Sequence, residues 1–319
     1  TTTRAYADPV ELDIAGNVDI AAILTADASA ATAGAALSVA LIAYADVRTE
    51  ATATVNPLVE SYLGGYADGR LVQAAGDISV GATMAAGAKA LVDGSSIAAG
   101  LGYAHAAPKA TAVIAPLTLD EKEEPVAAIS SSIRGGTVVS TDGDIVVKAV
   151  YNEDLSVEGT VIALGTGAEA TTHAASGSFV AKGSAEARAV ETPCLDSWVA
   201  GDTMLDDGST RSRATLSAGN IIRVISSSLT TPEAEASGKS GGFVGLGESD
   251  AYATGSPIVN AHMDGMIGSA ASPGAGLEVR AIGIDKAKAT AVVVAKGLGA
   301  DGDNESQATV SPTLDAHIG

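Results

Sequence analysis

Few residues in this chain have the types and spacing that chemistry requires. The four histidines, His105, His173, His262 and His317, are widely separated. None stands in a pattern with serine or cysteine and an acid that would support a Ser/His/Asp or Cys/His triad. The single cysteine, Cys194, follows a proline in an apolar segment and is interpreted as a buried small apolar group rather than a nucleophile. These residues predict that the protein is not an enzyme.

Two acidic segments are the best candidates for a bound ion. They contain Asp301, Asp303, Asn304 and Glu305 in one, and Asp206 and Asp207 in the other. Calcium takes six to eight oxygen ligands, which acidic turns in stacked repeats could supply. The spacing, however, matches neither an EF-hand loop nor a calcium-binding nonapeptide. Calcium is therefore the one cofactor that the sequence offers, and solvated acidic turns are the alternative.

The composition limits the partners of the chain. Its formal net charge is −20, and only 18 of 319 residues are Lys or Arg. Nucleic-acid binding needs clustered basic residues, so a nucleic acid is excluded as a partner. No run reaches the roughly 18 apolar residues of a spanning helix, so no membrane span is predicted in this segment. The glycine-rich residues 241–247 precede no predicted helix, which argues against a phosphate-binding loop.

The elements that position these residues are repeats. The segment 57–64 (PLVESYLG) returns at 193–201, 257–265 and 312–319. Counting from recurrent glycines gives repeats of approximately 16–75, 76–142, 143–218, 219–275 and 276–319, the last completed by residues 1–15 of a next unit. Residues 66–77 (YADGRLVQAAGD) also match residues 6–17 (YADPVELDIAGN). The two ends are therefore expected to fall at the same point of the repeat.

The residue pattern predicts strands throughout. Hydrophobic residues make up 46% of the chain but aromatic residues only 3%, so the interior must consist of small side chains. Alanine alternates with Thr and Val, as in residues 51–55 (ATATV), and no 3.6-residue apolar stripe persists. We predict an all-β solenoid, a parallel β-helix with wide coils built from about five imperfect repeats. An array of antiparallel β-hairpin or sandwich repeats is the alternative.

Stacked coils place equivalent side chains in columns about 4.8 Å apart. Aligning the repeats predicts three such columns. They are a turn column of Asn17, Asp77, Asp144 and Asn220, a ring column of Tyr62, Trp198, His262 and His317, and an acidic column of Glu60, Asp196, Asn260 and Asp315. A position that accepts Tyr, Trp or His favours a structural role, so the histidines of the ring column are assigned to packing.

The repeat openings, such as residues 75–80 (AGDISV), and the segment 51–64 (ATATVNPLVESYLG) resemble the repeats of very large bacterial surface proteins. The family that they are most similar to is the leukotoxin-like filamentous adhesins. The resemblance is one of repeat style and covers most of the chain. It implies a secreted or cell-surface β-solenoid filament, and it transfers no catalytic residues.

The sequence thus predicts the structural shaft of an extracellular or cell-surface bacterial filament or adhesin. Its main partner would be itself, through head-to-tail stacking or continuation of the same chain. Two alternatives stay open. A ligand-binding adhesin would contact a cell-surface or host ligand through the irregular segments 117–125 and 201–213. A carbohydrate-active β-helix enzyme would depend on Asp206 and Asp207.

Overall fold

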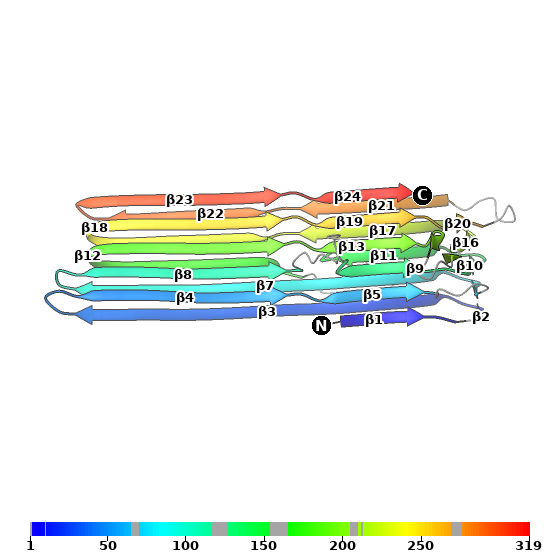
Figure 1. Ribbon diagram of the computed structural model, residues 1–319, viewed down its shortest axis with the longest axis horizontal. Helices are drawn as coiled ribbons and strands as arrows, with labels where there is room; N and C mark the ends of the chain where they lie inside the picture. The colour runs from blue at the N-terminus through cyan, green and yellow to red at the C-terminus, as the bar shows by residue number, and fades with distance from the viewer. Residues whose placement is uncertain are drawn as a thin grey trace.

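A computed structural model of the protein describes residues 2–9, 11–64, 70–115, 127–153, 165–204, 210–211, 213–268 and 276–319, with only the backbone of 203–204 and 210–211. Every regular element in these ranges is a β-strand. The chain winds in stacked coils from the N-terminal coil, blue in Figure 1, to the last strand, red in the same view. The prediction of an all-β solenoid is confirmed.

Each coil begins with two short strands that belong to two separate parallel sheets. Sheet A contains, in order, β1 (Thr2–Ala7), β5 (Leu58–Leu63), β9 (Ile129–Ile133), β13 (Cys194–Val199), β19 (Ile258–Met263) and β24 (Thr313–Ile318). Sheet B contains β2 (Glu11–Ile14), β6 (Leu71–Ala74), β10 (Thr137–Ser140), β16 (Thr215–Ala218) and β20 (Met266–Ile267). Strand order equals chain order, as successive coils of one helix require.

The rest of each coil runs out along a long arm and returns. The outgoing strands are β3 (Val18–Val39), β7 (Ile78–Ala99), β11 (Ile145–Tyr151), β17 (Ile221–Thr230), β21 (Gly276–Asp285) and β22 (Lys288–Lys296). The returning strands are β4 (Tyr44–Val55), β8 (Tyr103–Ile114) and β23 (Gly299–Val310). In the middle coils β12 (Gly167–Glu191) and β18 (Glu233–Gly255) contain both runs, because they reverse at the tip of the arm.

The ladder directions exclude the antiparallel alternative. Every pairing between coils in the described chain is parallel, and the one antiparallel pair there is the two-residue hairpin of β14 (Thr203–Met204) and β15 (Thr210–Arg211). The outgoing and returning runs of a coil therefore do not pair with each other, as a hairpin array would require. They pair with the equivalent runs of the coils above and below.

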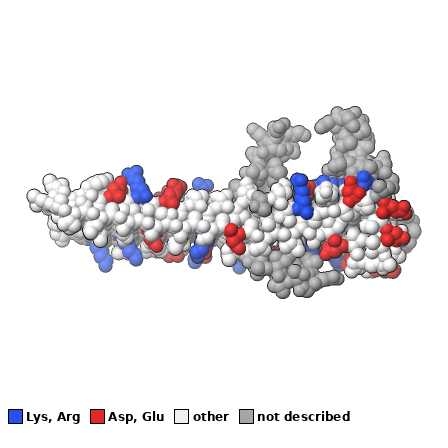
Figure 2. Space-filling model, turned by 90° about the horizontal axis from the view of Figure 1, so that it is seen from below, with Lys and Arg blue, Asp and Glu red and all other residues white. Residues whose placement is uncertain are grey.

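The cross-section of a coil has a wide head and a thin arm, as the view onto the N-terminal coil shows (Figure 2). In the head, sheets A and B and the start of the outgoing strands enclose branched side chains such as Ile78, Ile145 and Leu216, all fully buried. In the arm, the outgoing and returning sheets enclose mainly alanine, for example Ala90 and Ala112. The two core compositions explain the high alanine and low aromatic content.

Glycine permits the closest approach of the two arm sheets. A Cβ atom on Gly183 would lie 2.5 Å from the carbonyl oxygen of Lys239, and one on Gly238 would lie 2.5 Å from that of Glu248. Backbone atoms cannot move away from such a contact as the end of a side chain can. These glycines therefore set the thickness of the arm. At its tip Phe179 stacks on Phe243 with ring centroids 4.8 Å apart.

The recurrent prolines begin sheet A. Pro57, Pro193, Pro257 and Pro312 each precede the first residue of a sheet A strand. Their carbonyls take part in the ladder, since the N–H of Ile258 donates to Pro193 O at 2.9 Å. The missing N–H of proline is tolerated at a strand start, so these positions form the corner between the returning run and sheet A. Pro116 lies outside the described residues.

Candidate functional site

The predicted ring column is present on the outer face of sheet A. Tyr62, Trp198, His262 and His317 occupy equivalent positions of β5, β13, β19 and β24. The rings of Trp198 and His262 are stacked at 6.3 Å, and those of His262 and His317 at 5.2 Å. Ser132 of β9 interrupts the column, and the guanidinium of Arg134 covers the Tyr62 ring at 3.8 Å instead.

The column also contains Tyr6, which the sequence comparison placed differently. Matching residues 6–17 with 66–77 puts Tyr6 opposite Tyr66, but in sheet A Tyr6 pairs with Tyr62 and the rings stack at 4.9 Å. From Glu11, which pairs with Leu71, the predicted offset holds. The segment between β5 and β6 is four residues longer than that between β1 and β2, and the sequence match hides this insertion.

The acidic column lies beside the ring column on the same outer face, since the two positions are two residues apart in each strand. Glu60, Asp196, Asn260 and Asp315 are in register, with Arg4 and Ser130 completing the column. The acids contact basic side chains rather than one another. Glu60 accepts from Arg4 Nε at 2.7 Å and also contacts Arg134. Arg134 therefore joins the two columns, because it contacts Glu60 and also covers the Tyr62 ring.

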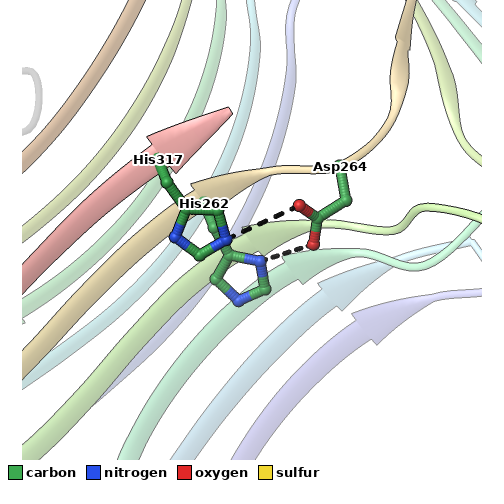
Figure 3. Close-up of side chains that lie close together, drawn as sticks. All are labelled: His262, Asp264 and His317. Atoms are coloured by element: carbon green, nitrogen blue, oxygen red, sulfur yellow. Dashed lines mark hydrogen bonds and ion pairs between the residues drawn. The ribbon is translucent and has the colours of Figure 1, made fainter. Parts of the chain in front are cut away.

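At the C-terminal end the histidines converge on an acid that sequence reasoning missed. Asp264 follows β19, and its carboxylate lies between His262 and His317 (Figure 3). His262 Nδ1 is 2.7 Å from Asp264 Oδ2, and His317 Nε2 is 3.8 Å from Asp264 Oδ1. The signal in the sequence was the spacing His262-x-Asp264, which places both side chains on one side of an extended chain.

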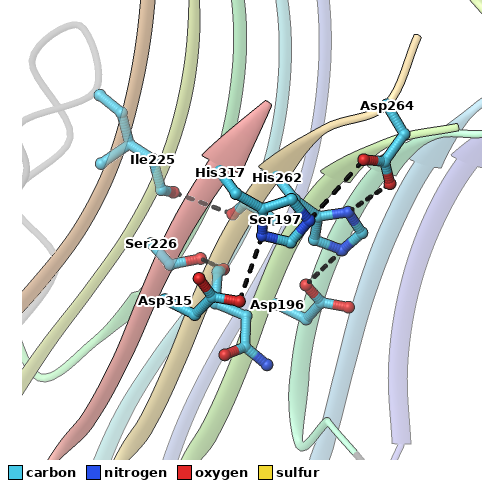
Figure 4. A network of polar contacts seen from close by, with 9 residues as sticks. Asp196, Ser197, Ile225, Ser226, His262, Asp264, Asp315 and His317 are labelled. Atoms are coloured by element: carbon cyan, nitrogen blue, oxygen red, sulfur yellow. Dashed lines mark hydrogen bonds and ion pairs between the residues drawn. The ribbon is translucent and has the colours of Figure 1, made fainter. Parts of the chain in front are cut away.

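The other ring nitrogen of each histidine meets a different carboxylate (Figure 4). His262 Nε2 is 3.3 Å from Asp196 Oδ1, and His317 Nδ1 is 3.1 Å from Asp315 Oδ2. Partial burial opposes protonation of His262, but hydrogen bonds and charge from Asp196 and Asp264 outweigh it and raise the pKa to about 9. Both rings are thereby held in fixed orientations.

Buried serines hold sheet A against the outgoing strands behind this cluster (Figure 4). Ser197 Oγ of β13 donates to the carbonyl of Ile225 at 2.9 Å, and Ser226 Oγ donates to the carbonyl of Asn260 on β19. A buried hydroxyl that lost its acceptor would cost about 1–3 kcal/mol. These bonds therefore fix β19, which carries His262, relative to the head core.

The turn column is formed by three of the four predicted residues. Asp77 N–H donates to Asn17 Oδ1 at 2.9 Å, and Asp144 N–H donates to Asp77 Oδ1 at 2.8 Å. Each of these side chains therefore accepts a hydrogen bond from the backbone of the next coil. The prediction for Asn220 was wrong by one residue, because Ile222 pairs with Ile145 and Ile221 therefore takes the position of Asp144. Burial of Ile222 in the head core sets this register.

The predicted calcium ligands are not brought together. Residues 299–310 form the strand β23 and not a turn. Because side chains alternate across a strand, Asn304 points away from the face that carries Asp301, Asp303 and Glu305. Asp206 and Asp207 lie outside the described residues, as do residues 117–125 and most of 201–213. The described part of the chain contains one group of three metal-ligating side chains, His262, Asp264 and His317.

The remaining histidines and the cysteine have structural surroundings. Cys194 is buried, as predicted, and burial followed by the charge of Asp196 raises the pKa of its thiol to about 11. His105 Nδ1 lies 3.0 Å from Asp46 Oδ1 on the neighbouring strand β4. His173 stands between Asp93 and Ser237 in the ladder of the arm.

A buried acid that the sequence analysis did not single out lies at the end of β12. Glu191 is fully buried, and its carboxylate accepts hydrogen bonds from Ala168 N–H at 2.6 Å, Thr231 N–H at 3.2 Å and the Tyr151 hydroxyl at 3.3 Å. Burial raises its pKa from 4.5 to about 7, although the backbone hydrogen bonds act in the opposite direction. Glu191 joins the broken outgoing strands of two coils, since Ala168 and Thr231 lie at those breaks.

Both end faces of the solenoid are open strand edges. Leu314 of β24 continues the inward column of Val59, Ile129, Leu195 and Val259. Those four are 0% exposed, whereas Leu314 is 48% exposed because no coil covers it in this structure. At the other end β1 is also a sheet A strand, so β1 and β24 occupy the same position of a coil. The expected match of the two ends is therefore shifted, and residues 2–7 repeat the position of 313–318 instead of following it.

Comparison with known proteins identifies no relative. No family model, no curated protein and no solved structure matches the chain. No helix in the described ranges is long and apolar enough to cross a bilayer.

Proposed function

We propose that this chain is a segment of the structural shaft of an extracellular or cell-surface filament, in which further coils of the same kind cover both end faces. The observation that carries the proposal is the open end face, where Leu314 is half exposed in a column whose other members are fully buried. A further sheet A strand would bury it. Unpaired parallel edges with apolar inner positions are surfaces that proteins normally cover.

The covering coils can come from a second copy or from the same polypeptide. Because β1 and β24 share one position, two copies that stacked continuously in all sheets would place two strands in one site of sheet A. One of these strands would have to be displaced. Continuation of the chain from β24 into a new sheet B strand would create no such conflict.

The shaft would transmit force through its backbone ladders. Neighbouring coils are joined over nearly their whole length, as in the 22-residue pairing of β3 with β7. The five coils account for a rise of only about 24 Å at roughly 4.8 Å per strand, so a functional fibre needs many more coils. The net charge of −20 would keep neighbouring shafts apart by repulsion. The cell-surface location is part of the proposal and is supported by the repeat style.

The mass of the protein isolated from its native source, measured under denaturing conditions, distinguishes stacked copies from a continuous chain. A mass near 31.2 kDa indicates stacked copies, and a much larger mass indicates a continuous chain. Electron microscopy should then show fibres far longer than five coils, and antibodies to the shaft should label intact cells. Isolated 31-kDa particles without fibres at any concentration would refute the shaft function.

The variant Leu314→Asp tests whether another coil covers the end face, and Leu101→Asp is the matched control. Leu101 lies at the tip of the arm in an internal coil and is 59% exposed. If another coil covers Leu314, its replacement should prevent fibre assembly or lower the thermal midpoint of a continuous chain, while Leu101→Asp should do neither. Equal behaviour of the two variants would count against coverage of this face.

A further inference from the structure

We propose that His262, Asp264 and His317 form a binding site for a divalent transition-metal ion of the Zn²⁺ class, bridging strands β19 and β24. This inference does not depend on the shaft function. The three side chains each offer one ligand atom, and these atoms all lie within 4.8 Å of one another. Figure 3 shows both imidazole rings directed at the same carboxylate.

The separations between the carboxylate and the two ring nitrogens suit a small ion. Zinc binds nitrogen and oxygen at about 2.0–2.2 Å in tetrahedral geometry, so two of its ligand atoms stand ~3.3 Å apart. Asp264 Oδ2 lies 2.7 Å from His262 Nδ1, and Asp264 Oδ1 lies 3.8 Å from His317 Nε2, so the carboxylate distances fall on either side of that value. One ligand atom from each of the three residues can be chosen so that all lie within 4.8 Å of one another. Small side-chain rotations would admit the ion. Asp264 and His317 are solvent-accessible, so a water molecule can take the fourth position.

A second, independent feature is the set of acids behind the histidines. In metal sites the ring nitrogen that does not bind the ion usually donates to a carboxylate or carbonyl, which fixes the ring orientation. Asp196 holds His262 Nε2 at 3.3 Å, and Asp315 holds His317 Nδ1 at 3.1 Å (Figure 4). His317 therefore already has a hydrogen-bonded outer partner in Asp315, and Asp196 lies within ion-pair distance of His262 Nε2. His105, which contacts Asp46, has no such second acid among the described contacts.

The donor set selects the kind of ion. Two imidazoles and one carboxylate favour Zn²⁺ or a neighbouring transition ion, whereas Ca²⁺ requires an all-oxygen shell. Because the ligands come from β19, the residue after it, and β24, the ion would link two successive coils across the ladder. Bound metal should therefore protect β24 at the C-terminal end face, in addition to the backbone bonds of that strand.

Titration of the metal-free protein with Zn²⁺ against a chromophoric chelator, at pH 8, tests the site, and binding should release the proton that Asp196 and Asp264 hold on His262. We expect one equivalent to bind, and Co²⁺ in place of Zn²⁺ should give the visible spectrum of a tetrahedral ion with nitrogen ligands. His262→Gln, Asp264→Asn and His317→Gln should each weaken binding by more than the roughly 10–100-fold that loss of an outer partner costs. Hydrogen exchange of β24 should slow on Zn²⁺ addition in the wild type but not in these three variants.

His105→Gln is the matched control, because it removes a histidine that contacts a single acid, and it should bind Zn²⁺ as the wild type does. Asp196→Asn removes only an outer partner and should weaken binding by about 10–100-fold while leaving all three ligands in place. Each variant is checked for unchanged β-sheet circular dichroism. A wild-type Kd weaker than about 0.1 mM, or His262→Gln and His317→Gln variants that bind as tightly as the wild type, would overturn the proposal.

Discussion

The buried carboxyl of Glu191 should make the stability of the solenoid depend on pH. Its pKa is about 7 in the folded protein and 4.5 in the unfolded chain. A carboxyl whose pKa is raised by folding contributes stability that is fully present below pH 4.5 and is lost as the pH rises through 7. The difference of 2.5 pKa units corresponds to about 3 kcal/mol. The wild type should therefore be less stable at pH 9 than at pH 4 by this amount from Glu191 alone.

The variant Glu191→Gln removes the titration and keeps the shape. Its amide nitrogen would replace the oxygen that accepts from Thr231 N–H, which costs one hydrogen bond, about 1 kcal/mol. The variant should thus be about 1 kcal/mol less stable than the wild type at pH 4 and about 2 kcal/mol more stable at pH 9. The two stability curves should cross between pH 5 and 6.

Urea-induced unfolding measured over this pH range provides the assay. The fluorescence of Trp198, the single tryptophan, reports on β13, which follows Glu191 after only two residues. Glu169→Gln is the control, because Glu169 lies on the same strand β12 but forms an exposed pair with Lys89. It should keep the pH dependence of the wild type. If Glu191→Gln loses as much stability between pH 4 and 9 as the wild type does, the assignment of this pH dependence to Glu191 is refuted.

Two further predictions concern the arm and the corner beside sheet A. Gly183→Ala should destabilise the protein by about 1–3 kcal/mol through overpacking, because the new Cβ would meet the Lys239 carbonyl. Gly241→Ala should not destabilise it, because a Cβ there would have nothing within 4 Å. Thermal unfolding of the two variants checks this prediction. Cys194 should resist iodoacetamide in the native state and react on unfolding, because its thiol is buried and has a pKa of about 11. Mass spectrometry before and after denaturation measures this reaction. Rapid labelling of the native protein would contradict the prediction.

The coil architecture could be predicted because its markers are local. Proline marks the start of sheet A, and glycine with Asx marks the start of the outgoing run, in each case because few residue types suit that backbone position. Asn220 shows where this reasoning fails. Its Gly219-Asn220 pair matched the other openings, but the larger apolar contact of Ile222 with the head core decides the register. A one-residue shift would have turned Ile222 to the outside.

The division of each coil into head and arm could not be predicted, because it depends on how far apart facing sheets lie. Alanine occupies both strand faces in this sequence, so its alternation does not show which face is inside.

The burial of Glu191 could have been predicted from the sequence. Glu191 occupies the column of Val55, Ile114 and Val310, where an acid among apolar residues indicates a buried charge, and Gly255 in the same column leaves space beside it.

Inner and outer columns differ in the chemistry that they can accept. An inner position such as Glu191 needs backbone donors from two broken strands, because an unsatisfied buried carboxylate would cost several kcal/mol. An outer position of sheet A must only stack on its neighbours, and Tyr62, Trp198 and His262 all meet that requirement. Substitution there leaves the head core unchanged, so a cluster such as His262, Asp264 and His317 can arise without weakening the ladder. Binding sites in solenoids of this kind should therefore be sought first where the outer columns of sheet A change residue type from coil to coil.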